Sequence, residues 1–510
     1  MNPDTPPPKL AASYLKRALL AAVLVVTLSA GGVSAAGIVA FEELVQTPSM
    51  PGRLPIKGIE QEIDAGDIDG PRTLLLLGTD ARYGDTEKPR ADTMVLVRLD
   101  PDGEAIAMTS VPRDLLVTIP GVGSGVKMNS AYHEGGPRLT VKTIKTLLST
   151  PQEPFEINHV AEVDFRGFRE AIDFIGCVYI DIDRDYFNDR GGPGGYATID
   201  IDPGYQKICG RKALDYVRYR HGDNDLVRNV RQQDFLRQVK DQTAVQEVLT
   251  WDRRRDVIKL VDTYLKTDRA LRHDRRTLTN VLRLMFYTKD KPVVSIPFRS
   301  HASADNINIV ANRGELRATV QAFMSPEVAG KSSIGKQATE PDQRAGDRAE
   351  RKRKPTGGPV PGLQDMRVVG ENQAVLAARQ TRKSGLAVYF PKVGPVGSQY
   401  DHGVPRMYWI RDETGQKRRS YRMVLRKGEL LPEYYGIQGT RWAHPPILDN
   451  PTETVRRGNR NLELFYEGKK LRIVAWRTPE AAYWVSNSLT KSLGNRQMIA
   501  MAESLKRLGG

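Results

Sequence analysis

Two aspartates, Asp80 and Asp92, are the first residues of this sequence whose placement could support chemistry. Asp80 follows an apolar run at residues 73–77, and Asp92 precedes a second run at 94–99. If both runs are strands, Asp80 lies past a strand end, where open α/β sheets form their ligand crevice, and Asp92 enters the adjacent strand. Two carboxylates at one edge suit Mg²⁺, with Mn²⁺ as an alternative, because such ions complete their shell with water and phosphate oxygens. Either aspartate alone would more commonly be a turn or helix-cap residue.

Arginines follow the same predicted edge. Arg113 comes after a third predicted strand at residues 105–110, so its side chain is expected at the same rim. Arg218 and Arg220 are two residues apart, and in an extended segment both side chains would project to one side. One such arginine would usually form a surface ion pair, but several at one rim indicate an anionic ligand.

A predicted helix adds three polar side chains. Asp225 has the residue type of an N-cap for a helix that begins near residue 226. Arg228 and Gln232 would then share a face near the positive end of the helix dipole, which attracts phosphate. Guanidinium groups brought together repel one another unless an anion lies among them, and their planar forks match phosphate oxygens. We therefore predict a metal-bound diphosphate as the ligand.

The elements that must position these residues alternate between strand and helix. Apolar runs predict strands at residues 73–77, 94–99, 105–110, 178–182 and 293–296. A 3.6-residue periodicity predicts helices at 130–148, 165–175, 211–217, 228–249, 256–265 and 276–287. This alternation predicts an α/β domain over residues 72–324.

The C-terminal part is predicted to be a second, smaller domain. Residues 325–384 are polar, contain a basic run followed by Pro and Gly, and are predicted to be a linker. Residues 385–510 are predicted to form a sheet-rich, basic α+β domain with 21 Lys and Arg and 11 Asp and Glu, which favours an anionic partner. Its predicted strands are 386–390, 407–411, 420–425, 462–466 and 471–476, and its predicted last helix is 495–508.

The N-terminus contains a segment long enough to span a membrane. Residues 18–41 carry no charge, and 24 residues at about 1.5 Å each cross a hydrocarbon core of about 30 Å. Three basic residues precede the segment and two glutamates follow it, which places residues 1–17 in the cytoplasm and the rest outside. A signal peptide cleaved near residues 33–35 would export the same domains. We expect a single-pass protein of the cell membrane with an extracellular α/β domain after an extended stalk at residues 42–71.

Composition narrows the class of protein. The net charge of +15 predicts attraction to anionic partners, while 40% hydrophobic residues exclude disorder throughout the chain. Cys177 and Cys209 are the two cysteines, too few for a zinc-finger framework. In an exported domain we expect them to form a disulfide, with two buried thiols as the alternative.

Five short segments together resemble the LytR-CpsA-Psr family of bacterial cell-wall ligases. They are residues 78–82 (GTDAR), 90–93 (RADT), 111–114 (VPRD), 213–221 (ALDYVRYRH) and 228–233 (RNVRQQ). The resemblance implies an α/β/α sandwich with a mixed central sheet. It also implies a phosphotransferase that moves a glycopolymer from a polyprenyl diphosphate carrier, whose lipid tail occupies a tunnel, onto peptidoglycan through a phosphodiester. The region after residue 385 does not resemble the extra domain of some family members.

The resemblance also implies roles for the predicted site residues. Asp80 and Asp92 would hold Mg²⁺, Asp92 and Arg113 would be catalytic, and Asp225 and Gln232 would shape the cluster. The base that deprotonates the acceptor hydroxyl has no candidate in the sequence. The arginines that would neutralise the diphosphate are Arg82, Arg90, Arg113, Arg218, Arg220 and Arg228.

Two alternative functions use the same residues. One is a polyprenyl-diphosphate phosphatase with water as the acceptor, and the other is a non-catalytic wall-polymer-binding or regulatory protein such as a transcription attenuator. A DNA regulator would need its basic domain inside the cell, against the predicted orientation, so nucleic acid is not an expected partner. The Arg/Ala-rich composition is typical of a high-GC actinobacterium and favours arabinogalactan or teichoic-type polymers.

Overall fold

The computed structural model describes most of the chain after residue 54. The described ranges are 55–67, 69–80, 88–191, 197–220, 225–242, 263–303, 308–328, 360–381, 385–401, 403–429 and 431–509. Within these ranges no helix is both long and apolar enough to cross a bilayer. The predicted membrane segment, residues 18–41, lies outside the described residues.

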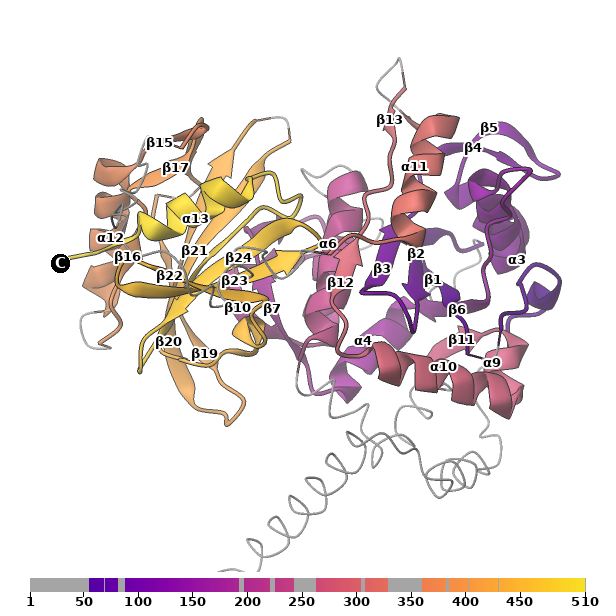
Figure 1. Ribbon diagram of the computed structural model, residues 1–510, viewed down its shortest axis with the longest axis horizontal. Coiled ribbons are helices and arrows are strands. Elements are labelled where there is room, and N and C mark those ends of the chain that lie inside the picture. Colours follow the sequence, from indigo (N-terminus) through magenta and orange to yellow (C-terminus); the bar gives the residue numbers. More distant parts are fainter. Residues whose placement is uncertain are drawn as a thin grey trace, which may run out of the picture. The chain divides into compact units, whose positions relative to one another are not determined.

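The first sheet has six strands in the order β11-β6-β1-β2-β3-β12 (Figure 1). β1 pairs antiparallel with β2 and parallel with β6, so the sheet is mixed, as the resemblance implied. The strands are β1 (Arg72–Thr79), β2 (Ala91–Leu99), β3 (Ile106–Ser110), β6 (His159–Asp164), β11 (Leu265–Thr267) and β12 (Val293–Ser295).

Helices cover both faces of this sheet because its central strands are apolar on both sides. Leu75 and Leu77 of β1 pack in a cluster with side chains of α3 (Asn129–Leu148) and α11 (Arg313–Met324). Leu74 and Leu76 face a second cluster with Leu236 of α6 (Asp225–Lys240) and Leu284 of α10 (Arg275–Thr288). Strands buried on both faces read as continuous hydrophobic runs, and this is why the sequence predicted them.

An insertion between β6 and α6 forms a small unit of its own. Its helices α4 (Phe165–Phe174) and α5 (Gly210–Arg218) pack on two small two-stranded sheets in one apolar cluster. The cysteines that we expected to pair form a disulfide, which ties the residue before β7 to the N-cap of α5. The paired strands are β7 (Val178–Ile182) with β10 (Gly204–Ile208), and β8 (Tyr186–Asn188) with β9 (Ile199–Ile201).

The C-terminal part is built on a second sheet of eight strands. Its path is β18-β20-β21-β25-β24-β23-β22, and β19 also pairs with β20. Two helices, α12 (Arg367–Thr381) and α13 (Asn495–Glu503), contribute to its apolar core. The strands are β18 (Ser398–Tyr400), β19 (Arg406–Arg411), β20 (Lys417–Lys427), β21 (Glu433–Thr440), β22 (Glu453–Arg457), β23 (Arg460–Glu467), β24 (Lys470–Arg477) and β25 (Ala482–Ser486).

Several predictions of element type or length were wrong. The predicted linker, residues 325–384, contains α12, whose Ala374 and Ala377 are fully buried in the second core. Small alanines pack closely without producing a strong amphipathic pattern, so the helix was not recognised. The last helix ends at Glu503 rather than at residue 508, because residues 506–507 pair with 389–390. Leu265, predicted as helical, begins the edge strand β11.

Buried charges, as well as apolar contacts, join the C-terminal sheet to the insertion and to α6. Asp181 on β7 pairs with Arg422 on β20 at 3.1 Å, and both side chains are nearly inaccessible to solvent. Glu467 on β23 lies 2.6 Å from the Lys491 ammonium and 3.5 Å from the guanidinium of Arg237 on α6. Burial raises the pKa of Glu467, but its cationic neighbours outweigh burial and lower the pKa to about 2.

Replacing Glu467 by Gln is expected to destabilise the chain by about 3–5 kcal/mol, because Arg237 loses a buried counterion. Because the folded pKa lies below that of the unfolded chain, this stabilisation is present at neutral pH and disappears as the pH falls from about 5 toward about 2. Urea unfolding of wild type and variant across this pH range measures the difference.

The matched control is Glu503→Gln, which removes an exposed pair with Arg457 at 3.3 Å. It should change the free energy of unfolding by less than about 0.5 kcal/mol. Equal losses for the two variants would contradict a special role of the buried pair.

Candidate functional site

A β-bulge at the end of β1 and β2 involves both predicted metal ligands, because Asp92 lies in it and Asp80 follows the last residue of β1. Gly78 pairs with Thr93, but Thr79 pairs with Ala91, so Asp92 is the additional residue of the bulge. Bulges redirect side chains and are frequent next to active sites. Asp80 follows Thr79 directly, and its backbone N–H donates to the carbonyl of Arg90.

Backbone contacts hold Asp80 in this position. One of its carboxylate oxygens accepts a 2.7 Å hydrogen bond from the backbone N–H of Arg90. The Asp80 backbone N–H donates in turn to the Arg90 carbonyl, so two hydrogen bonds join these two residues. The Arg90 side chain is exposed. Arg82 lies outside the described residues, so its predicted role stays a prediction.

Arg113 is the centre of the charged cluster. It follows β3 and donates to the Asp92 carboxylate, and its Nε lies 3.5 Å from Asp114 and 3.4 Å from Asp225. Burial alone would lower the pKa of Arg113, but Asp92 and Asp225 outweigh it and raise that pKa. The Arg113 guanidinium therefore stays protonated, and carboxylates of β2 and α6 hold it in position.

α6 contributes a second arginine to the cluster. Arg228 is 2% exposed and donates to Asp225 at 2.8 Å and to the main-chain carbonyl of Asp92 at 3.2 Å. Burial lowers the pKa of Arg228 and raises that of Asp225. Gln232 donates to the carbonyl of Val217 at 3.1 Å, which attaches α6 to the end of α5. Asp225 and Gln232 thus hold neighbouring groups in place, Asp225 the Arg228 guanidinium and Gln232 the end of α5.

Arg218 and Arg220 do not lie together on an extended segment, which corrects that prediction. Arg218 is the last residue of α5 and pairs with Asp215 of the same helix at 2.9 Å. Its guanidinium also lies over the Phe165 ring. Arg220 is exposed beyond the helix end. Burial raises the pKa of Asp114, but the Lys127 hydrogen bond and the charges of Arg113, Lys127 and Arg220 outweigh it and lower that pKa. The helix extends to residue 218, so the two side chains leave different backbone conformations.

Three residues with clear positions in the site were not predicted. Asp114 bridges Arg113 and Lys127, with the Lys127 ammonium 3.0 Å away. Gln233 donates to the Ser110 hydroxyl at 2.8 Å and so links α6 to the end of β3. Arg231 is fully buried and donates to the Tyr186 hydroxyl and to the carbonyl of Tyr219. The sequence did place Arg231 about one helical turn after Arg228. That position does not show whether the Arg231 side chain is buried or exposed.

The donor set fits a hard divalent cation. Asp80 uses one carboxylate oxygen for the Arg90 amide, and Asp92 is one-third exposed despite its bond to Arg113. Mg²⁺ commonly binds through one or two carboxylates and takes its remaining ligands from water and substrate phosphates. Asp80 and Asp92 at the bulge supply carboxylates of this kind, with cationic groups beside them for the phosphates.

Comparison with known proteins identifies the class. The sequence profile of the LytR_cpsA_psr family matches residues 53–310, which is half of the chain. The chain therefore belongs to this family, as the motifs indicated.

Individual relatives are more distant. The polyisoprenyl-teichoic acid–peptidoglycan teichoic acid transferase TagV of Bacillus subtilis is 32% identical over 178 residues, which are 34% of this chain and 44% of TagV. A TagU transferase of Bacillus cereus is 29% identical over 239 residues, 46% of this chain and 72% of that protein. The crystal structure of B. subtilis TagV aligns with a TM-score of 0.39 at 25% identity, over 50% of this chain and 96% of that one. The chain thus spans less than half the length of the TagV relative.

Arg231 is expected to be a structural residue behind the site. Arg231→Lys should lower the free energy of unfolding by about 2–4 kcal/mol, because a lysine cannot serve the Tyr186 hydroxyl and the Tyr219 carbonyl together. Urea denaturation followed by circular dichroism measures this loss. Arg166→Lys, at an exposed pair with Glu170, is the control and should change it by less than about 0.5 kcal/mol. An unchanged Arg231 variant would contradict the role.

Proposed function

We propose that this chain is a membrane-anchored phosphotransferase that moves a glycopolymer from a polyprenyl diphosphate carrier onto peptidoglycan through a phosphodiester. The observation that carries the proposal is the cluster of Arg113 and Arg228 around the Asp92 bulge. These residues come from three separate elements and meet at one edge of the sheet. The named activity of the TagV and TagU relatives supports the same reaction class.

The cluster accounts for binding of the donor diphosphate. Arg113 and Arg228 are guanidiniums whose donors can match phosphate oxygens in a bidentate manner. Both share the Asp225 carboxylate, so an entering diphosphate exchanges one anion for another rather than creating unpaired charge. Asp225 and Asp114 keep the arginines in place before the substrate arrives.

The proposed reaction forms one P–O bond and breaks another. The acceptor hydroxyl gives its proton to water and attacks the phosphorus attached to the glycopolymer, and the bond from this phosphorus to the bridging oxygen breaks. The lipid leaves as a monophosphate, and the polymer stays linked to peptidoglycan through a phosphodiester. Arg113 and Arg228 stabilise the negative charge that develops on the departing phosphate.

Asp80 and Asp92 would hold Mg²⁺, which supplies Lewis-acid polarisation of a phosphate oxygen when bound. Arg113 keeps the Asp92 carboxylate oriented and remains charged throughout, because its pKa is raised by its carboxylate partners. Arg220 and Arg90, both exposed, extend the positive charge from the cluster toward solvent, where a polyanionic substrate approaches.

The proposed location follows from the N-terminal sequence. The uncharged segment at residues 18–41 would anchor the chain, and the positive-inside rule keeps residues 1–17 in the cytoplasm. The catalytic domain then faces the wall, where lipid-linked polymer and peptidoglycan are both present. The disulfide between Cys177 and Cys209 is compatible with that oxidising compartment.

Arg113→Ala and Asp92→Ala are expected to reduce polymer transfer at least about 100-fold, because each removes a group that contacts the diphosphate or its counterions. The measurement is transfer of radiolabelled polymer from a polyprenyl diphosphate donor to peptidoglycan by the full chain in detergent.

Arg98→Ala is the matched control for these two variants. Arg98 lies on the same strand as Asp92 and pairs with Asp100 at 3.4 Å, away from the bulge. It should retain transfer. Release of free polymer phosphate without a peptidoglycan product would indicate the phosphatase instead, and full activity of both site variants would refute the assignment.

Removal of divalent cations should abolish transfer, and Mg²⁺ or Mn²⁺ should restore it, because the carboxylates at the bulge supply oxygen ligands. Electron paramagnetic resonance of Mn²⁺ gives a readout that does not depend on turnover. Asp80→Asn and Asp92→Asn should weaken Mn²⁺ binding at least about tenfold, since each loses an anionic ligand. Unchanged binding in both variants would exclude this pair as the metal site.

A further inference from the structure

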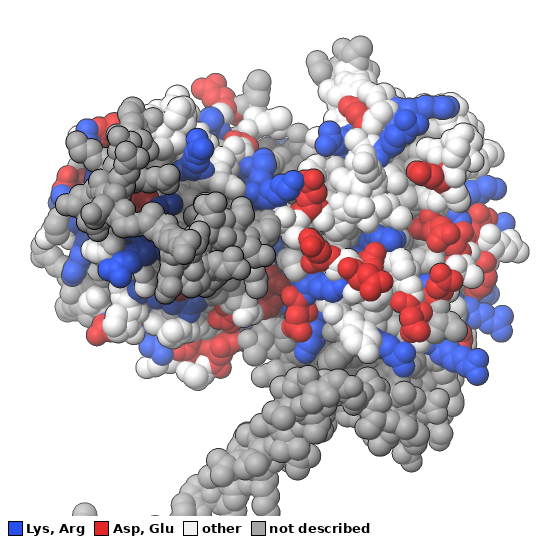
Figure 2. Space-filling view, viewed as in Figure 1, with Lys and Arg blue, Asp and Glu red and all other residues white. Residues whose placement is uncertain are grey.

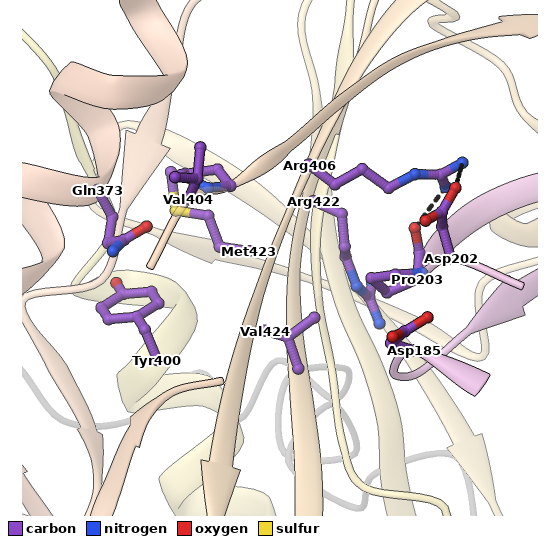
Figure 3. A pocket seen from close by; sticks show the side chains of 11 residues that line it. Asp185, Asp202, Pro203, Gln373, Tyr400, Val404, Arg406, Arg422, Met423 and Val424 are labelled. Carbon is purple, nitrogen blue, oxygen red and sulfur yellow. Dashed lines mark hydrogen bonds and ion pairs between the residues drawn. The ribbon is translucent and has the colours of Figure 1, made fainter. Parts of the chain in front are cut away.

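A second site is suggested by a cavity at the junction between the insertion and the C-terminal sheet. Its volume is about 260 Å³, and Figure 3 shows residues from both parts around it. Asp185 and Asp202 come from the insertion, whereas Arg406 and Arg422 come from β19 and β20. Ligand cavities occur preferentially at such junctions. None of the residues that line this cavity belongs to the Arg113 cluster.

Carboxylates outnumber the cations around this cavity. Arg406 pairs with Asp202 at 2.9 Å, Arg422 pairs with Asp181 at 3.1 Å, and Asp185 in the lining is a third carboxylate. An anion would therefore meet a net negative charge, and a cation would lie beside two guanidinium groups. This lining favours an uncharged ligand over an anion.

The lining nevertheless offers many hydrogen-bonding groups. The Tyr400 hydroxyl and the Arg422 Nε are buried and have no hydrogen-bond partner among the described residues. Such groups cost free energy unless water or a ligand satisfies them. Gln373, whose amide donates to the carbonyl of Gly403 at 3.1 Å, lies near Tyr400 on the same side of the cavity (Figure 3).

Apolar side chains complete the lining. Met423 and Val424 of β20 lie between the Tyr400 side and the arginine side of the cavity (Figure 3). Val404, which is 55% exposed, also lines it, so it offers a position for a blocking substitution. A sugar ring combines the same two kinds of group as the lining, with apolar C–H groups on its faces and hydrogen-bonding hydroxyls on its rim. A single sugar ring is small enough for this cavity, whose volume lies below the roughly 300–1,000 Å³ that is typical of sites for larger ligands.

We infer that this cavity binds one uncharged sugar residue of a glycan chain. The inference goes beyond the proposed function, which it uses only to name two sources of such a chain, the peptidoglycan acceptor and the polymer donor. The cavity and the diphosphate cluster are connected through packed residues. Tyr186, the residue after Asp185, accepts a hydrogen bond from Arg231 on α6, the helix that carries Arg228.

The test is saturation-transfer NMR with the full chain in detergent micelles and two probes. One probe is an oligomer of N-acetylglucosamine, representing the peptidoglycan backbone, and the other is a neutral galactan oligosaccharide. We expect saturable binding of at least one probe, and the probe that binds identifies the source of the glycan. Saturation by neither probe, or binding only of a phosphate-bearing oligosaccharide, would overturn the inference.

Val404→Trp should weaken the binding at least about tenfold by filling the cavity, whereas one lost hydrogen bond in Tyr400→Phe should cost about three- to tenfold. Val396→Trp is the matched control, because Val396 is 50% exposed and does not line the cavity. Tyr216→Phe removes another buried hydroxyl without a partner and should leave sugar binding unchanged. Equal effects of Val404→Trp and Val396→Trp would overturn the inference.

Failure of this inference and failure of the proposed function are distinguishable. Arg113→Ala should lose polymer transfer but keep sugar binding, because Arg113 is not part of the cavity lining. If that variant transfers polymer normally while Val404→Trp still loses the sugar, the phosphotransferase assignment is wrong and the sugar site stands. If sugar binding is lost in Arg113→Ala while the fold is intact, the sugar was bound at the diphosphate cluster and the cavity assignment is wrong.

Discussion

The pairing of Arg113 with carboxylates from β2 and α6 is the interaction on which the site depends. Burying a guanidinium without a counterion is expensive, and Arg113 is shielded on most sides. Asp92 and Asp225 supply that counterion only if the bulge in β2 and the start of α6 both reach the end of β3. The electrostatic requirement of one side chain therefore fixes how three elements meet.

The same requirement recurs where the C-terminal sheet meets the insertion and α6. Asp181, Arg422 and Ser486 form a buried polar contact in which the Ser486 hydroxyl donates to Asp181 at 2.7 Å. Arg237, Glu467 and Lys491 form a second one. Figure 2 shows exposed charges of both signs on the visible face of the molecule. Apolar contacts alone tolerate sliding, whereas a buried charge must meet its partner, so these contacts fix the docking of the C-terminal sheet on α6 and the insertion.

The sequence predicted the parts of the fold that depend on local patterns. The leucine-rich β1 was anticipated from its apolar run, and helices α4 and α10 from their apolar periodicity. The bulge at Asp92 was not predictable, since it depends on the register between two strands. Helix α12 was missed because its buried face consists largely of alanine.

The site was predicted in part for the same reason. Motifs identified Asp92, Arg113, Asp225 and Arg228, which the structure brings together. They could not show that Arg218 pairs within its own helix, because the helix end was expected one residue earlier. Nor could they show that Arg231 serves backbone carbonyls, since a buried arginine and an exposed one have the same local sequence signal.

The two candidate ligand sites differ in how their charges are used, and this difference separates their ligands. At the bulge, Arg113 and Arg228 share the Asp225 carboxylate, and the exposed Arg220 adds a third guanidinium nearby. In the cavity, Arg406 and Arg422 each have a carboxylate of their own. A diphosphate gains more at the first site than at the second, while an uncharged ring loses nothing by entering the second. A glycan joined to a diphosphate contains both kinds of group, so a chain that handles such a substrate benefits from keeping the two environments apart.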